Sequence, residues 1–81
     1  MYKALSNHVI QRYKDRGLKL HRLHKDLSMK NLRKMITAND GSKLVYTKNN
    51  LKFVIKDGVV LTVMKIRPYD IKRDLKKHGY M

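Results

Sequence analysis

The chain has 81 residues, contains no Cys, and carries 20 Lys and Arg against 6 acidic residues, a formal net charge of +14. A chain of this length builds one domain around one thin core, which excludes multidomain proteins and large cofactor-binding enzymes. We therefore treat residues 1–81 as a single domain with a helical part at 6–37, a sheet at 43–66 and a basic segment at 69–81.

The absence of Cys excludes disulfides, thiolate zinc sites and cysteine nucleophiles, and it indicates a reducing compartment. We therefore expect a cytoplasmic protein. The longest uncharged apolar run, at 59–64, is far shorter than the ~20 residues of a membrane helix, so we expect no membrane association.

Two or three helices are predicted in the N-terminal part. Ser6 has the character of an N-cap and Gly17 that of a helix terminator, so a short helix is predicted over 7–16. Leucines at helical spacing predict a second helix over 18–27. A third helical segment is predicted from Ser28 to about Thr37, because Leu32, Met35 and Ile36 would share one helical face.

After residues 39–41 the spacing of the apolar residues changes from about 3.6, typical of a helix, to 2, typical of a strand. This change predicts a three-stranded antiparallel meander. The strands are expected at 44–48, 51–56 and 59–66, joined by turns at Asn49-Asn50 and Asp57-Gly58. The last strand is apolar on both faces and ends at Arg67-Pro68, after which residues 69–77 can form a short basic helix. The expected fold class is therefore α+β, with helices first and the meander second.

The positive charge is spread over the chain, since residues 1–40 and 41–81 each contribute ten Lys and Arg and three Asp. Self-repulsion of this size destabilises a compact state unless a polyanion usually lies against it. The charge therefore favours RNA, DNA or a ribosomal surface as partner. An acidic protein partner and a purely solvated basic surface are the alternatives.

Metal chemistry is disfavoured by the sequence. There is no Glu and no Asp-x-Asp, so convergent carboxylates for Mg²⁺ are not expected. His21 and His24 could share a zinc ion, but no third ligand has a suitable spacing. No Gly-rich phosphate loop is present either, and we expect no metal and no small-molecule cofactor.

Metal-free RNA cleavage needs a proton acceptor, a proton donor and cations around the phosphate. His8, Arg12 and Arg16 have the i, i+4, i+8 spacing that places them in one row on the first helix. The row could hold a phosphate, although a His and two Arg on an exposed helix flank are also ordinary surface residues.

Four short runs of the sequence also match the pattern of a known superfamily. The run SNHVIQRYKDRGL at 6–18, followed by LVY at 44–46, FVI at 53–55 and DGVVLTVM at 57–64, is similar to the RelE-like and colicin-type (barnase-EndoU-colicin-RelE) ribonuclease superfamily. BrnT-type toxins and their small bacterial and phage relatives are nearest in pattern. The chain departs from that pattern by an extra helix-like segment, by the lack of a clear fourth strand, and by basic residues where the helix surface is usually acidic.

The resemblance implies a helix packed on one face of the sheet, with RNA lying across the sheet and the helix flank. It implies His8 as general base or acid, Arg12 and Arg16 as phosphate binders, and Thr62 as a residue that hydrogen-bonds the scissile phosphate. Tyr46 could stack on a base. Other expected RNA-binding residues are the cations along and beyond the strands: Lys48, Lys52, Lys65 and Arg67.

Three functions are therefore open. The first is a metal-independent endoribonuclease of RelE-like type that cleaves RNA by attack of the 2′-hydroxyl, alone or on the ribosome, with an acidic antitoxin as a further partner. The second is a non-catalytic phage- or plasmid-encoded regulator that binds nucleic acid or a host protein. The third is a DNA-binding helix-turn-helix over 20–36.

Overall fold

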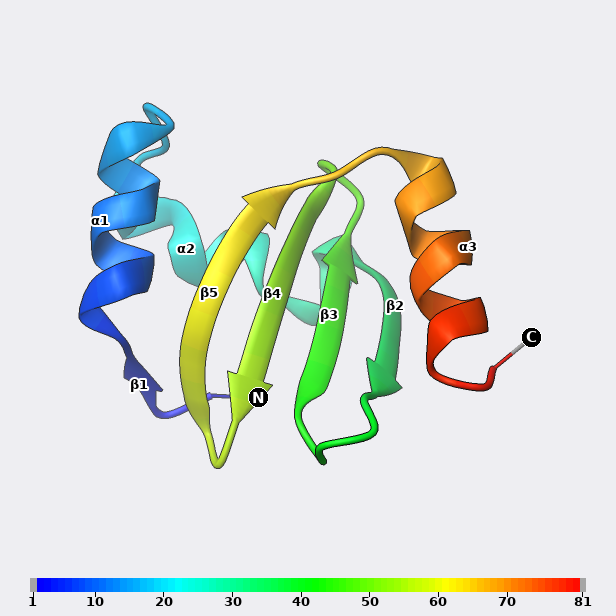
Figure 1. Cartoon of the computed structure of the whole chain (residues 1–81). Helices are drawn as coiled ribbons and strands as arrows, with labels where there is room; N and C mark the ends of the chain where they lie inside the picture. The colour runs from blue at the N-terminus through cyan, green and yellow to red at the C-terminus, as the bar shows by residue number, and fades with distance from the viewer. Residues whose placement is uncertain (1, 81) are drawn as a thin grey trace.

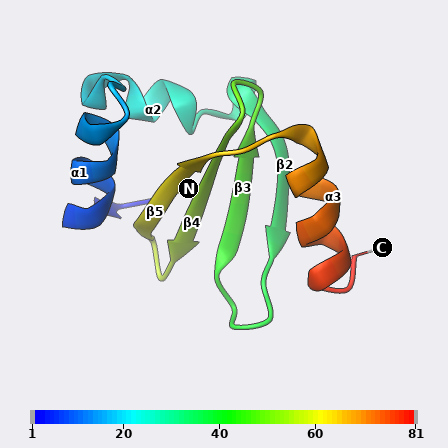
Figure 2. The same cartoon turned by 45° about the horizontal axis from the view of Figure 1, so that its top comes forward.

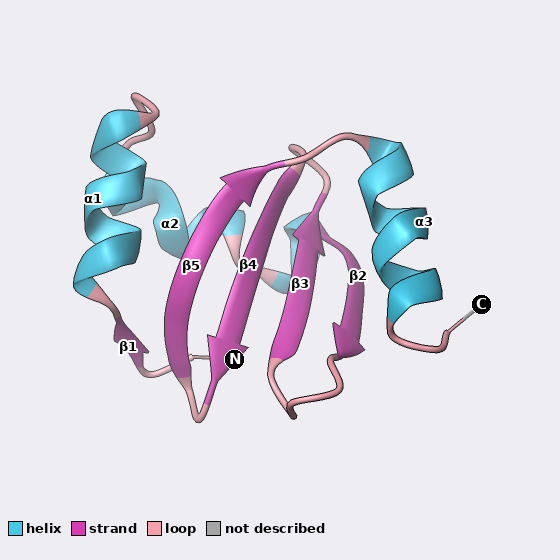
Figure 3. Ribbon diagram, in the orientation of Figure 1, coloured by secondary structure: helices cyan, strands magenta, loops and turns pink. Residues whose placement is uncertain are grey.

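The computed structural model describes residues 2–80 and centres on a five-stranded mixed sheet of order β1-β5-β4-β3-β2. Strand β1 runs parallel to β5, and the other neighbouring strands are antiparallel. The helices α1 and α2 pack on one face of the sheet and α3 packs on the other (Figures 1 and 3). The fold is α+β, but the predicted arrangement of N-terminal helices followed by a three-stranded meander is wrong.

Helix α1 spans Asn7–Asp15. The Ser6 hydroxyl accepts a hydrogen bond from the Val9 N–H at 3.2 Å, which satisfies one of the free donors of the first turn. Beyond the C-cap Arg16, Gly17 has φ +67°, where a side chain would be strained. Both predicted ends of this helix are therefore confirmed to within one residue.

The segment after α1 contains only short helical turns: η1 (Leu20–Arg22), α2 (Leu23–Asp26) and η2 (Met29–Asn31). No side chain caps the start of η1, α2 or η2. Leu23 and Leu27 are buried, so tertiary packing holds this segment where helix propensity alone would not. The predicted helix over 18–27 is reduced to these turns.

Strand β2 spans Leu32–Thr37, where a third helix was predicted. It pairs antiparallel with β3, and a bulge at Arg33 shifts the register between Leu32 and Lys34. Leu32 therefore packs against the core on the α1 face, whereas Ile36 is buried under α3. A helix-turn-helix over 20–36 is excluded because its second helix is this strand.

The remaining strands follow the predicted meander. They are β3 (Lys43–Thr47), β4 (Leu51–Lys56) and β5 (Val59–Lys65). Asp57 and Gly58 have φ values of +53° and +79°, as a type I′ turn requires, and Asn50 has φ +63°. The turn predictions are confirmed. The two-residue strand β1 (Ala4–Leu5), which pairs with β5, was not predicted.

Helix α3 spans Pro68–Lys77 and confirms the predicted C-terminal helix. The carboxylate of Asp70 accepts the Arg67 N–H at 2.8 Å, which caps the first turn, and Pro68 occupies a position where no N–H is needed. At its other end, the Tyr80 hydroxyl donates to the Thr37 carbonyl and accepts from the Thr37 N–H, both at 3.0 Å. The chain end thereby covers part of the outer edge of β2.

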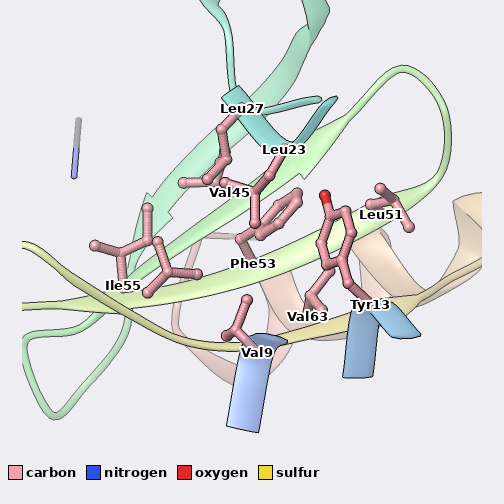
Figure 4. Packing of buried hydrophobic residues seen from close by; sticks show 10 residues of the cluster. Val9, Tyr13, Leu23, Leu27, Val45, Leu51, Phe53, Ile55 and Val63 are labelled. Carbon is pink, nitrogen blue, oxygen red and sulfur yellow. The ribbon is translucent and has the colours of Figure 1, made fainter. Parts of the chain in front are cut away.

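The sheet has a core on each face. The larger core lies under α1 and α2, with Phe53 at its centre and the Tyr13 ring centroid 6.4 Å from that of Phe53 (Figure 4). The smaller core lies under α3 and contains Ile36, Leu44, Tyr46 and Ile71. Figure 2 shows α3 standing over the β2–β3 side of the sheet, away from β5.

Candidate nucleic-acid interface

Helix α1 presents the predicted histidine and arginine row to solvent. Val9 and Tyr13 are buried against the sheet, so the neighbouring positions His8 and Arg12 are exposed on the helix flank. The Arg12 Nε donates a hydrogen bond to the His8 Nε2 at 3.3 Å, an arrangement that requires a neutral imidazole. Arg16 is half-buried at the end of the helix, and its Nε has no protein partner.

Thr62 lies on the opposite face of the sheet from α1. Its cross-strand partner is Val54, which packs with the α3 core, whereas the next residue, Val63, packs with the α1 core. The alternation of side chains along β5 therefore directs Thr62 away from the helix that carries His8 and Arg12. The structure does not bring the four expected catalytic residues together.

Tyr46 is fully buried, with 0 % of its surface exposed. Its hydroxyl donates to the Asp74 Oδ2 at 2.8 Å beneath α3. Burial, followed by the hydrogen bond to a carboxylate and the charge of Asp74, raises the pKa of the Tyr46 phenol, which stays neutral. The ring is therefore an anchor between sheet and helix and cannot stack on a base.

Lys52 forms an ion pair with the same carboxylate, that of Asp74, beneath α3. Its Nζ lies 2.7 Å from the Asp74 Oδ2 and 5.9 Å from the centroid of the Tyr46 ring. Burial of Asp74 opposes its ionisation, but the hydrogen bonds from Lys52 and Tyr46 outweigh this and hold the carboxyl pKa below its usual value. The charge of Lys52 is thus neutralised within the fold.

The other three expected RNA-binding cations are exposed and lie at one end of the sheet. Lys48 follows β3, Lys65 ends β5 and Arg67 is the N-cap of α3. Two hydrogen bonds join segments at this end. The Lys48 N–H donates to the carbonyl of Asn31, just before β2, at 2.8 Å, and the Ile66 N–H donates to the carbonyl of Asn50, in the β3–β4 turn, at 3.0 Å. We call residues 17–31, 48–50 and 65–67 the turn end; Figure 2 shows α2 and the β3–β4 turn along the top of the view.

The turn end also carries four cations that were not predicted as RNA-binding residues: Lys19, Arg22, Lys25 and Lys30. They line hollows between the segment after α1 and the β3–β4 turn. The inward-facing leucines Leu20, Leu23 and Leu27 indicate that the cations among them are exposed, but not that these cations meet the β3–β4 turn. A regular helix, as predicted for this segment, would instead have presented the cations as an ordinary solvated face.

Comparison of the chain with protein-family models, curated proteins and solved structures finds no match. Within residues 2–80, no three His, Asp or other metal-ligating side chains come close enough to hold a metal ion. In the same range, every helix is too short or too polar to cross a bilayer.

Proposed function

We propose that this protein binds RNA through its phosphate backbone, as a non-catalytic binder. The observation that carries the proposal is the shortage of internal counter-charges. Within residues 2–80, Lys52 and Arg73 are the only Lys or Arg side chains within 4.0 Å of a carboxylate, although the chain has 20 of them. The remaining cations are free to neutralise an external polyanion.

RNA is favoured over duplex DNA because the segment that would form a DNA recognition helix is strand β2. A cytoplasmic location, where RNA and ribosomes are abundant, is part of the proposal and is supported by the absence of Cys. An acidic host protein or antitoxin could use the same surface, and direct binding of RNA at low salt distinguishes the two kinds of partner.

We expect the protein to bind a short single-stranded RNA at low salt, with an affinity that falls by roughly 0.7 log units per phosphate contact for each tenfold rise in salt. Fluorescence anisotropy with a labelled oligonucleotide measures this slope. An uncharged-backbone analogue of the same base sequence is the matched control and should not bind. Equal binding of the analogue, or no binding of any RNA at low salt, would show that the proposal is wrong.

A second candidate function, a metal-independent endoribonuclease of RelE-like type, is favoured by the Arg12–His8 hydrogen bond. A neutral imidazole beside a guanidinium could accept the 2′-hydroxyl proton while the cation holds the phosphate. No fourth strand was predicted from the sequence, but β2 is a fourth antiparallel strand, as in the pattern of that superfamily, and α1 packs on one face of the sheet, as the resemblance implied. The positions of Thr62 and Tyr46 count against this function.

Cleavage in EDTA tests the second function. If the protein is a nuclease, it should produce 2′,3′-cyclic phosphate ends, and His8→Ala should lower the rate by about a hundredfold or more because the proton acceptor is lost. His21→Ala removes another exposed histidine and should leave the rate unchanged. RNA that stays intact, with and without ribosomes, would exclude the enzyme and leave the binder.

A further inference from the structure

Two adjoining hollows lie at the turn end, between the residues that follow α1 and the β3–β4 turn. The first is lined by Gly17, Leu18, Lys19, Arg22, Asp26 and Asn49. The second is lined by Arg22, Lys25, Asp26, Lys30, Asn31 and Asn49. Because Arg22, Asp26 and Asn49 belong to both, the two hollows form one continuous depression with a shared centre.

The shared centre is held in place by a network of side chains. The Asp26 carboxylate accepts from the Tyr13 hydroxyl at 2.8 Å and from the Asn49 Nδ2 at 3.1 Å. The Asn31 Nδ2 donates to the Asp26 carbonyl at 3.0 Å and to the Asn49 Oδ1 at 2.9 Å. These bonds tie α1, α2, the residues before β2 and the β3–β4 turn together, so the depression is preorganised.

The network also determines the charge of the depression. Both carboxylate oxygens of Asp26 are engaged by neutral donors, and none of the four lining cations lies within ion-pair distance of a carboxylate in the described part of the chain. The rim therefore carries four uncompensated positive charges above one negative charge at the centre. A phosphate would be attracted by these cations and repelled by the Asp26 carboxylate, so it would bind to the cations and not to the centre.

We infer that this depression is the main phosphate-binding site for RNA, and that it takes successive phosphates of one strand, with Lys19 in the first hollow, Lys25 and Lys30 in the second, and Arg22 between them. This inference rests on the proposed function and adds a location to it. The rim offers no exposed aromatic ring to a base, because Tyr13 is buried beneath it. A linked strand therefore gains from several cations at once, whereas a single nucleotide does not.

The inference also accounts for the other cations at this end. The Lys48 backbone is bonded to Asn31 at the edge of the depression, and the end of β5, with Lys65, is bonded to the same β3–β4 turn. A strand leaving the depression could continue past these side chains toward Arg67. Three of the five RNA-binding residues expected from the sequence thus extend the same site.

The test compares two variants that each lose four positive charges. In the site variant, Gln replaces the four lining cations Lys19, Arg22, Lys25 and Lys30. In the control variant, Gln replaces four exposed lysines at the opposite end of the sheet: Lys43, Lys56, Lys76 and Lys77. Each phosphate contact contributes roughly 0.7 to the slope of log affinity against log salt concentration. The loss of four contacts should therefore reduce the slope by about 3 in the site variant, whereas the control variant should lose less than about 1.

A measurement on the unmodified protein guards against misfolding of the site variant. The NMR signals of the Asn31 and Asn49 side-chain amides should shift when single-stranded RNA is added. Equal losses in both variants, or amide signals that stay still while RNA binds, would overturn the site and leave the proposed function standing. Equally tight binding of a mononucleotide would overturn the inference that a strand is needed, and failure of the unmodified protein to bind RNA would overturn both.

Discussion

Replacement of Asp74 by alanine is expected to lower the free energy of unfolding by about 2 to 3 kcal/mol. The Asp74 side chain is 9 % exposed, and its Oδ2 accepts from both Tyr46 and Lys52. Its loss leaves a phenol and an ammonium without their acceptor beneath α3. Removing one partner of a buried ion pair costs about 3 to 5 kcal/mol, but Lys52 is 15 % exposed and can recover some hydration.

Thermal and urea unfolding measure this loss. For a domain of this size, 1 kcal/mol corresponds to roughly 4–8 °C, so the midpoint should fall by roughly 8–24 °C. Asp15→Ala is the matched control, because Asp15 is exposed and only accepts a hydrogen bond from Gln11. It should change stability by less than about 0.5 kcal/mol. Similar midpoints for the two variants would mean that Asp74 does not anchor α3.

The contribution of Asp74 should also depend on pH. Its pKa in the folded protein lies below the ordinary value of 3.8, so the folded state binds a proton less readily than the unfolded chain. The stabilisation is therefore complete above about pH 4 and is lost as the pH falls through the folded pKa. The stability difference between the unmodified protein and Asp74→Asn should shrink on acidification below that point. A difference that stays constant would contradict the pKa shift.

The elements that could be predicted from the sequence are those with local signals. A side-chain cap at Ser6, a positive φ at Gly17 and a two-residue turn at Asp57-Gly58 are each specified by residues within a few positions of one another. Helix α3 likewise begins at Pro68 with a capping carboxylate three residues after the N-cap. None of these features requires knowledge of the tertiary fold.

The missed elements depend on pairing between distant residues. Strand β1 has only two residues and exists because Ala4 and Leu5 lie beside β5. In β2, the bulge at Arg33 disturbs the two-residue alternation, so the apolar positions imitate a helical period. No local signal distinguishes these cases, because the strand that each one pairs with is specified elsewhere in the chain.

The same limit applies to the candidate site. Spacing along one helix correctly placed His8 and Arg12 together. It could not show that Thr62 faces the other side of the sheet or that Tyr46 is covered by α3, since both depend on strand register and on a helix at the other end of the chain. The depression at the turn end was missed for a similar reason, because its lining comes from segments joined only in the folded structure.

Ile36→Ala and Met35→Ala form a matched pair that tests the strand assignment of β2. Ile36 is 3 % exposed beneath α3, whereas Met35 is 44 % exposed beyond the reach of the α1 and α2 core. We therefore expect Ile36→Ala to cost about 2 to 4 kcal/mol and Met35→Ala less than about 1 kcal/mol. Urea unfolding of both variants measures the difference.

The two structures possible for this segment predict different outcomes. In a helix, Leu32, Met35 and Ile36 would share one buried face, and both alanine variants would lose similar stability. In the strand, adjacent side chains point to opposite faces, and only the face under α3 is covered at this edge of the sheet. Equal losses would therefore reinstate the helix, and with it the helix-turn-helix mode of DNA binding that β2 excludes.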